Sequence, residues 1–316
     1  MKVRTLIGAF APFEMAKRSA RVAAAGAMLS LAPVLTALAA DPSPTLERIK
    51  STKSMVLAVR ETSNPFAFNN GKDQFIGYSV ELCEAVAKGI QTELGLPEMG
   101  ITYVPVTGAE RLEVITKDFA DIECSTTSIT RKRLESVSFS VATFYSASVL
   151  VGRKGSVAVR AEDLAGKRVA VGEKTIQETW LKGLANKGVK VEVETYKNPN
   201  DGFLALLSGR ADFFATDDLQ AISMLDASEG NKAKAGLMDL RFLPNTYGLM
   251  LSKADPAFKE AVDRQLRAYF ASGASREAYR KWFERPIPPT GKAIGWAIPA
   301  PLEELFLTPS DAALID

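Results

Sequence analysis

The chain has 316 residues, of which 47% are hydrophobic and 24% are charged, with a formal net charge of +2. This composition predicts a globular protein with a proper core and excludes a disordered chain. Because the sequence has no histidine and only two cysteines, it lacks the commonest transition-metal ligands, and we expect neither a metal site nor a cofactor. The same absence excludes the usual Ser-His and Cys-His nucleophile pairs.

The N-terminal segment differs from the rest of the chain. Three basic residues between positions 17 and 21 precede an uncharged stretch over 22–40 that is rich in Ala and Leu, a pattern typical of a secretory signal peptide. A stretch of this length also suits a membrane anchor, but Pro33 and the small-x-small motif Ala37-Leu38-Ala39 favour cleavage. We therefore predict a signal peptide over 1–40 and a periplasmic mature protein.

Removal of residues 1–40 takes away five basic residues and one acidic residue, which leaves 34 basic and 36 acidic residues of the original 39 and 37. The formal charge of the mature chain is then about −2 at pH 7. Without a basic tail or block, neither nucleic acid nor an anionic membrane surface is an expected partner. Cys83 and Cys124 either form a disulfide in this oxidising compartment or remain buried thiols.

After the leader, short apolar runs alternate with amphipathic stretches, which predicts α/β architecture with mixed sheets covered by helices. In the first unit, the predicted strands lie over 55–59, 101–106 and 120–124, and the predicted helices over 80–94 and 109–117.

The pattern then restarts. The second unit has predicted strands over 167–171, 189–195 and 211–215, and predicted helices over 175–186, over 201–208 and from 217. A strand over 247–251 and a helix around 262–270 follow, and the proline-rich stretch from 286 is expected to be irregular. Two units of about 100 residues fit the usual size of a domain better than one large core does.

Several motifs point to a known family. They are VRETSNPF at 59–66, FIGYS at 75–79, IECSTTSITRKR at 122–133, SGRAD at 208–212, YGLM at 247–250 and KWF at 281–283. In their order and spacing, from about Thr45 to the end, the chain resembles the amino-acid-binding periplasmic proteins of ABC importers. The similarity is greatest to their glutamate/aspartate-binding branch.

This resemblance implies the two-lobed type II periplasmic binding protein fold. Each lobe would hold a mixed sheet flanked by helices, and two crossing segments near 144–148 and 245–247 would join the lobes and act as a hinge. On this basis lobe 1 combines 41–146 with 247–316, and lobe 2 spans 147–246. The protein would be a monomer that carries an amino acid to ABC permease subunits.

An α-amino acid needs an opposite charge for each of its two charged groups once it is desolvated. The family's Ser-Ile-Thr-x-x-Arg motif assigns the α-carboxylate to Arg133, whose guanidinium matches a carboxylate with two parallel hydrogen bonds. Ser128 and Thr126 are placed to add hydroxyl groups. Thr175 is expected at a helix N-terminus, where a hydroxyl and free N–H groups favour an anion.

Asp217 follows a predicted strand and is the candidate for the ligand's ammonium, with a helix N-cap as the alternative. Its neighbour Asp218 would be a capping or solvated residue. Arg60 and Arg111 match arginines that the glutamate/aspartate-binding relatives use for the distal carboxylate, whereas lone arginines more often form surface ion pairs.

The sequence departs from the family at Gly108, where relatives tend to have a hydroxyl, and at Pro199, where they have a histidine. Specificity could therefore have moved towards a different or larger acidic ligand, with water in place of the lost contacts. Phe66 and Phe68 either wall the cleft or pack in the core.

Two rival functions remain. One is an enzyme on the same fold, similar to periplasmic dehydratases, in which Glu110 or Glu173 would act as general acid or base. The other is a sensory ligand-binding protein. The pairing of Arg133 with Asp217 suits an amino-acid zwitterion and favours a binding protein over the enzyme. A sensory protein would have to act through a separate partner. The sequence does not distinguish glutamate from aspartate as the ligand.

Overall fold

The computed structural model describes residues 42–288 and 290–316. The predicted signal peptide over 1–40 lies outside these residues. None of the helices in the described ranges combines the length and apolar character that a bilayer-spanning segment needs.

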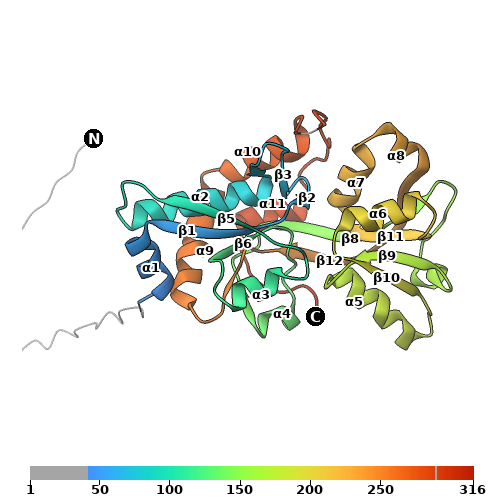
Figure 1. Cartoon of the computed structure of the whole chain (residues 1–316), viewed down its shortest axis with the longest axis horizontal. Helices are drawn as coiled ribbons and strands as arrows, with labels where there is room; N and C mark the ends of the chain where they lie inside the picture. The colour runs from blue at the N-terminus through green and yellow to red at the C-terminus, as the bar shows by residue number, and fades with distance from the viewer. Residues whose placement is uncertain (1–41, 289) are drawn as a thin grey trace, which may run out of the picture. The chain divides into compact units, whose positions relative to one another are not determined.

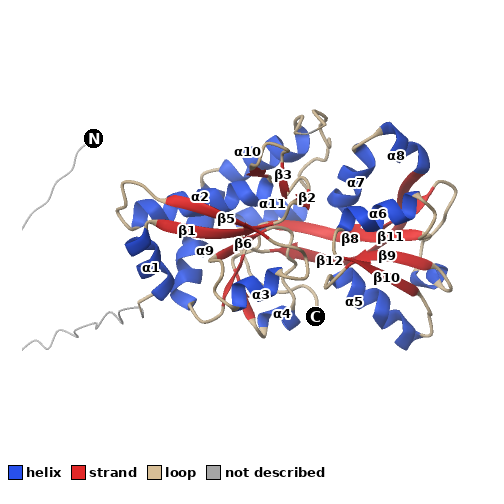
Figure 2. Cartoon of the chain, viewed as in Figure 1, coloured by secondary structure: helices blue, strands red, loops and turns tan. Residues whose placement is uncertain are grey.

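Helices and strands alternate along most of the chain (Figures 1 and 2). The helices that the structure describes are α1 (Pro44–Thr52), α2 (Tyr78–Glu93), α3 (Arg111–Thr116), α4 (Arg131–Leu134), η1 (Ala161–Leu164), α5 (Ile176–Gly183), η2 (Leu184–Lys187), α6 (Pro199–Leu207), α7 (Asp218–Asp226), α8 (Glu229–Lys234), α9 (Pro256–Ala271), α10 (Ala274–Tyr279), η3 (Arg280–Glu284) and α11 (Ala300–Leu307).

The strands are β1 (Ser54–Val59), β2 (Thr62–Ser63), β3 (Ala67–Asn69), β4 (Phe75–Ile76), β5 (Gly100–Pro105), β6 (Ile122–Cys124), β7 (Val137–Phe139), β8 (Phe144–Arg153), β9 (Arg168–Gly172), β10 (Glu192–Tyr196), β11 (Phe213–Asp217), β12 (Ala235–Tyr247) and β13 (Met250–Ser252).

Two five-stranded mixed sheets form the centres of two lobes. The first has the strand order β5-β1-β6-β13-β7 and the second the order β10-β9-β11-β8-β12. In each sheet three strands run parallel, and the two that follow pair antiparallel. A small antiparallel sheet of β2, β3 and β4 adjoins the first lobe's helix α2. The predicted two-lobed type II fold with mixed sheets is confirmed.

Both faces of each large sheet are buried against helices, as in Figure 2. In β1, Leu57 and Val59 pack in the cluster that includes residues of α2 and α9, whereas Ala58 packs in the cluster that includes residues of α3. Successive side chains of a strand point to opposite faces. A strand covered on both faces is therefore apolar at every position, which is why this strand could be predicted from the sequence.

The second sheet follows the same rule. Val149 and Val151 of β8 pack with residues of α6 and α7, whereas Leu150 between them packs in the cluster on the other face. Strands β8 and β12 lie side by side where the chain passes between the sheets (Figure 1). Their antiparallel pairing extends to Phe144 opposite Tyr247, within the segments predicted as crossings. The lobe boundaries at 146/147 and 246/247 remain a prediction.

The C-terminal stretch differs from its prediction. The segment after 286 was expected to be irregular throughout, but α11 lies within it. Pro299 occupies the N-cap of this helix, and proline is well tolerated in a first helical turn because the N–H groups there need no helical partner. Leu302 and Phe306 are buried and anchor the helix to the first lobe's core.

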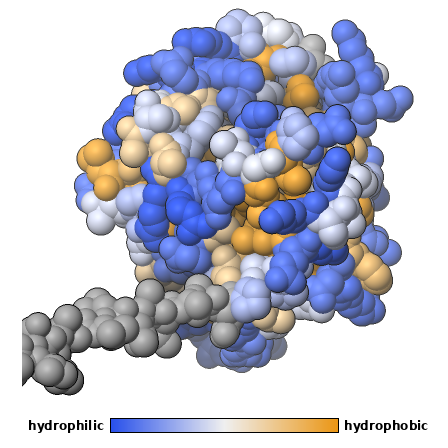
Figure 3. All heavy atoms as spheres, turned by 90° about the vertical axis from the view of Figure 1, so that its left-hand side faces the viewer, coloured by the Kyte–Doolittle hydropathy of each residue, from blue (hydrophilic) through white to orange (hydrophobic). Residues whose placement is uncertain are grey.

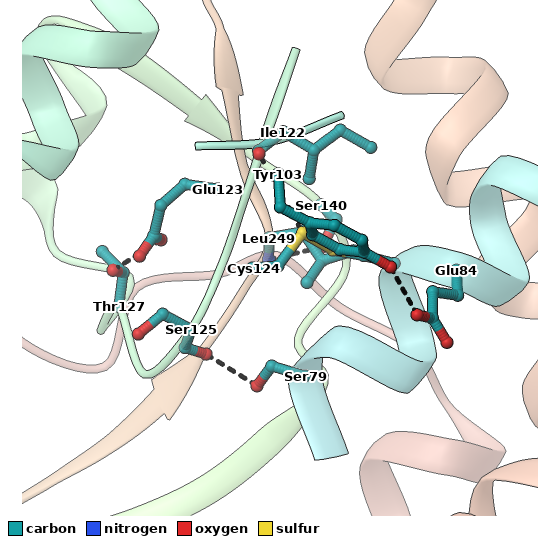
Figure 4. Close-up of a disulfide and its surroundings, with 11 residues drawn as sticks. Ser79, Glu84, Tyr103, Ile122, Glu123, Cys124, Ser125, Thr127, Ser140 and Leu249 are labelled. Carbon is teal, nitrogen blue, oxygen red and sulfur yellow. Dashed lines mark hydrogen bonds between the residues drawn. A yellow bond between two sulfur atoms is a disulfide. The ribbon is translucent and has the colours of Figure 1, made fainter. Parts of the chain in front are cut away.

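Cys83 of α2 and Cys124 of β6 form a disulfide, with their Cα atoms 6.2 Å apart (Figure 4). Both cysteines are fully buried, so the alternative of two free thiols is wrong. Close to the disulfide, the Ser79 hydroxyl donates a 2.8 Å hydrogen bond to the Ser125 carbonyl. Together these links tie α2 to the loop that follows β6.

Figure 3 shows one face of the molecule, turned from the view in Figure 1. This face is mainly hydrophilic, and its hydrophobic residues gather in small patches between polar ones. Scattered apolar surface of this kind is normal for a folded protein in water.

Candidate ligand-binding site

A cavity lies at the carboxyl ends of strands from both large sheets. Arg60 directly follows β1, the loop containing Thr126 and Ser128 follows β6, and Gly172 and Asp217 are the last residues of β9 and β11. In open α/β sheets this edge is where ligands bind, because the chain leaves each strand there in a loop. The seven residues predicted for the site all line this one cavity: Arg60, Arg111, Thr126, Ser128, Arg133, Thr175 and Asp217.

Three guanidinium groups line the cavity from the first lobe. Arg60, Arg111 and Arg133 are between 3% and 8% exposed, so none of them is a surface residue. Burial, followed by the charge of the neighbouring Arg111, lowers the pKa of Arg60 to about 10 and that of Arg133 to about 9. Burial also lowers the pKa of Arg111. At neutral pH, Arg60 and Arg133 stay charged and contribute positive charge to the cavity.

Arg133 is fixed by its own segment. The Thr130 hydroxyl caps α4 by accepting a hydrogen bond from the Arg133 N–H at 3.1 Å. The guanidinium Nη1 donates to the Ser128 carbonyl at 2.7 Å, and Nη2 donates to the Lys174 carbonyl of the second lobe at 3.1 Å. The loop after β6 and the second lobe therefore orient this guanidinium together.

Arg111 is less fully satisfied. Its Nη2 donates to the Lys174 carbonyl at 3.4 Å, and its buried Nε has no acceptor among the residues that the structure describes. Ser63 also lines the cavity, and its buried hydroxyl likewise has no partner within 42–288 and 290–316. Since buried polar groups in native proteins are nearly always hydrogen-bonded, these two groups are available to a polar ligand.

Glu123 of β6 is a buried carboxylate close to Arg111 that the sequence analysis did not assign. It is fully buried, and its Oε2 accepts a 2.8 Å hydrogen bond from the Thr127 hydroxyl, while Oε1 has no partner in the described part of the chain. Burial raises the pKa of Glu123, and the positive charge of Arg111 opposes this shift. A glutamate inside an apolar strand was the available signal, because such a residue is rarely buried without a partner.

Asp217 lies at the end of β11 and at the N-cap position of α7, but its side chain makes no capping hydrogen bond. Instead, Oδ1 accepts a 2.8 Å hydrogen bond from the Gln177 side chain. Burial is the main cause that raises the pKa of Asp217 to about 7, and the neighbouring Asp218 acts in the same direction. Asp217 lines the cavity. Its raised pKa means that the carboxyl group is costly to ionise while no cation lies next to it.

Asp218 is not solvated, which corrects one of its two predicted roles, but it does serve the first turn of α7, because its Oδ1 accepts the Leu219 N–H at 2.9 Å. It is 6% exposed. Its Oδ1 accepts from the Ser146 hydroxyl at 2.8 Å, and its Oδ2 pairs with Arg241 at 2.6 Å. Ser146 belongs to β8 and Arg241 to β12, so this carboxylate joins α7 to the two strands that pass between the sheets.

The three hydroxyl residues are placed as predicted, but two of them already have protein partners. The Thr126 hydroxyl accepts from the Gln220 side chain at 3.2 Å, a contact between the lobes. The Thr175 hydroxyl caps α5 by accepting from the Glu178 N–H at 3.2 Å and donates to the Gly172 carbonyl at 2.7 Å. Thr175 therefore contributes chiefly by placing the start of α5 at the cavity.

The two departures from the family both lie at the cavity. A Cβ atom at Gly108 would come within 3.2 Å of Arg60 Nη1, so the missing side chain leaves room for that guanidinium. Pro199 begins α6 and lines the cavity together with Lys197, a cation that the sequence analysis missed.

Phe66 packs in the core against Phe144 with ring centroids 4.7 Å apart, so of its two alternatives core packing is correct.

Phe68 lies in the same core cluster and packs edge-on against Trp282 at 6.1 Å. Gln177 and Gln220 are buried cavity residues that sequence reasoning also missed. The only sequence feature that could have identified them is a polar residue on the inward-facing side of the first turn of a helix, and many helices have such a residue.

The cavity has the elements needed to hold a zwitterion. Guanidinium groups from the first lobe and a carboxylate from the second can bind opposite charges on one small molecule. Within residues 42–288 and 290–316, no group of three or more Cys, Asp and Glu side chains is arranged to hold a metal ion.

Comparisons with known proteins agree with this geometry. The family model described as bacterial extracellular solute-binding proteins, family 3, matches residues 55–285. The chain is 34% identical over 297 residues to the L-glutamate/L-aspartate-binding protein of Pseudomonas aeruginosa, which covers 91% of this chain and 94% of that protein. It is 29% identical over 274 residues to the glutamate/aspartate import solute-binding protein of Salmonella typhimurium, covering 85% of this chain and 89% of that protein.

The same fold occurs among solved structures. A mutant of ArgBP from T. maritima superposes with a TM-score of 0.68 at 25% identity, over 76% of this chain and 99% of that chain.

Proposed function

We propose that this chain, which belongs to family 3 of the bacterial extracellular solute-binding proteins, captures an acidic amino acid in the cavity between its lobes. Arg133 would bind the α-carboxylate, and Asp217 would bind the ammonium group. Arg60 and Arg111 would bind the distal carboxylate, while Thr126, Ser128 and Thr175 complete the polar lining. The observation that carries this proposal is that three buried arginines of one lobe and a buried aspartate of the other share one cavity.

The charge balance of the cavity favours an acidic ligand over a neutral one. Four cationic groups, those of Arg60, Arg111, Arg133 and Lys197, line the cavity together with the carboxylates of Glu173 and Asp217. The buried Glu123 next to Arg111 adds a third carboxylate when all of these groups are ionised. This leaves one positive charge in excess. Glutamate or aspartate carries one net negative charge and neutralises the excess, whereas a neutral amino acid leaves an uncompensated buried charge, which is strongly unfavourable.

The identities of the relatives support the same ligand class, since both curated relatives named above bind or import glutamate and aspartate according to their names. We further propose that the chain is exported by cleavage of residues 1–40, acts in the periplasm as a monomer, and delivers its ligand to ABC permease subunits. Lobe 1 would comprise 41–146 with 247–316, and lobe 2 would comprise 147–246.

We propose that the protein is not an enzyme. Of the two carboxylates considered as general acid or base, Glu110 is exposed, and its Oε2 accepts a 2.9 Å hydrogen bond from the Thr107 N–H, which lowers its pKa. Glu173 lines the cavity, but the neighbouring groups are those expected for binding a zwitterion. An acid paired with a suitably placed base would be needed for catalysis.

Calorimetry with a panel of amino acids tests this proposal. For the preferred acidic ligand we expect a Kd of about 0.1 to 10 μM, with no loss of ligand over hours. Arg133→Ala should weaken every amino acid. Arg60→Ala should weaken glutamate about 10- to 100-fold, because it removes a hydrogen bond to a charged group, and should affect glutamine far less.

Arg160→Ala, which changes an exposed arginine of the second lobe, serves as the control and should bind like the wild type. Equal losses for glutamate and glutamine in Arg60→Ala contradict the assignment of this residue to a distal carboxylate. Conversion of the ligand into a product contradicts the binding-protein assignment itself.

A further inference from the structure

Lys174 makes more contacts between the lobes than its exposed position suggests. It lies in the loop between β9 and α5 of the second lobe. Its carbonyl oxygen accepts hydrogen bonds from Arg133 Nη2 at 3.1 Å and from Arg111 Nη2 at 3.4 Å, and its ammonium group donates to the Ala109 carbonyl at 3.1 Å. All three partners belong to the first lobe.

The backbone of Lys174 is held in an unusual conformation. Its φ angle is +54°, in the left-handed region that residues other than glycine rarely adopt. The Glu178 carboxylate accepts the Lys174 N–H at 2.5 Å, and the adjacent Thr175 caps the helix that follows. The start of α5 therefore holds the Lys174 carbonyl towards the arginines.

These contacts link closure of the lobes to the orientation of two guanidinium groups. One carbonyl receives a donor from each of the two arginines, so both side chains are fixed from the opposite lobe. The Lys174 ammonium adds a second point of attachment, at the Ala109 carbonyl. None of these hydrogen bonds involves the amino-acid ligand, so they stabilise the closed arrangement whichever amino acid is bound.

We propose that Lys174 is a positioning residue that holds the lobes together and fixes Arg111 and Arg133 in the orientation that receives the ligand. This inference rests on the proposed binding function for its effect on affinity. Because apparent affinity scales with the population of the binding-competent conformation, Lys174 raises the affinity for every amino acid by the same factor. It therefore sets how tightly the ligand is held without selecting among ligands.

Lys174→Gly isolates the ammonium group, because glycine readily adopts a positive φ and keeps the carbonyl in place. Lys174→Met retains most of the side chain and removes only its charge. Stopped-flow measurements should show glutamate dissociating about five- to tenfold faster from both variants, since a hydrogen bond from a charged group is lost. The ratio of the Kd values for glutamate and glutamine should stay as in the wild type.

Small-angle X-ray scattering of the ligand-free proteins is the second measurement. Both variants should have a larger radius of gyration than the wild type, while Lys190→Gly, at an exposed lysine of the same lobe, should match it. Unchanged scattering and unchanged dissociation rates in both variants overturn the proposal. The scattering comparison needs no ligand, so it separates a failure of this inference from a failure of the proposed function.

Discussion

Gln177 and Asp217 are joined by a 2.8 Å hydrogen bond from the glutamine Nε2 to the aspartate Oδ1. The same nitrogen also donates to the Ser148 hydroxyl at 2.9 Å. All three side chains are buried. The amide therefore connects α5, β8 and the end of β11, and it holds the carboxylate that we assign to the ligand's ammonium group.

Replacement of Gln177 by leucine should weaken the binding of all amino acids. The substitution removes a donor to a buried carboxylate, and hydrogen bonds to charged groups contribute about 1.5–3 kcal/mol. We expect a loss of about tenfold or more in affinity for glutamate and glutamine alike, measured by calorimetry. An unchanged affinity would show that the hydrogen bond from Gln177 is not required for Asp217 to bind the ligand.

The raised pKa of Asp217 predicts how stability depends on pH. Its carboxyl titrates at about 7 instead of its ordinary 3.8, so between pH 4 and 7 the folded protein holds a proton that the unfolded chain has released. Stability of the ligand-free protein therefore falls as pH rises through this window. In Asp217→Asn this contribution is absent, and its stability relative to the wild type should increase from pH 4 to pH 7.

Urea denaturation of both ligand-free proteins at pH 4.5, 6 and 7.5 checks this prediction. Glu123 is buried in both proteins, so its contribution to the pH dependence of stability cancels when the variant is compared with the wild type. Asp217→Asn should at the same time lose amino-acid binding, which marks a residue that serves binding at the expense of stability. Parallel pH profiles for the two proteins contradict the raised pKa.

The Cys83–Cys124 disulfide should contribute substantially to stability. It closes a loop between cysteines 41 positions apart, and the chain-entropy model gives a stabilisation of about 4 kcal/mol for a loop of this size. The double variant Cys83→Ala/Cys124→Ala should unfold at a clearly lower urea concentration than the oxidised wild type. A loss below about 1 kcal/mol would mean that the reduced unfolded chain remains compact or that the link adds little.

Gly108→Ala should reduce affinity for acidic ligands more than for neutral ones. The added Cβ would lie 3.2 Å from Arg60 Nη1, a closer approach than packed side chains normally allow, so the guanidinium must move. We expect glutamate to bind about three- to tenfold more weakly by calorimetry, in line with a modest overpacking cost. Gly183→Ala, where the new methyl group meets open space, is the matched control. A similar loss in the control, or the same loss for glutamine, contradicts this explanation.

The elements predicted best were those whose environment is uniform along the chain. The strand near 55–59 was found because burial on both faces makes every residue apolar. The strand near 211–215 was found because Phe213, Phe214 and Ala215 are apolar in succession. Helix α11 was missed because its prolines were interpreted as breakers, although they lie at its start. Strand β12 was missed because its burial alternates and its residues include Pro244 and Asn245, which favour turns in isolation.

For the candidate site, family motifs brought seven residues to one cavity, because each motif lies at the end of a strand or the start of a helix. The partners of those residues were not predictable. Gln177 and Glu123 have no distinguishing neighbours in the sequence, and their roles appear only when α5 and β6 are placed beside Asp217 and the arginines.

The sequence by itself determined the class of the fold, the positions of most buried strands and the residue types that could hold a zwitterion. These depend on local periodicity, composition and short motifs, which are complete within a few tens of residues. Only the tertiary structure decided that Cys83 pairs with Cys124, that Asp218 joins α7 to β8 and β12, and that Lys174 reaches across to two arginines. Those contacts join residues between 23 and 72 positions apart, and packing selects them from many combinations that local preference cannot rank.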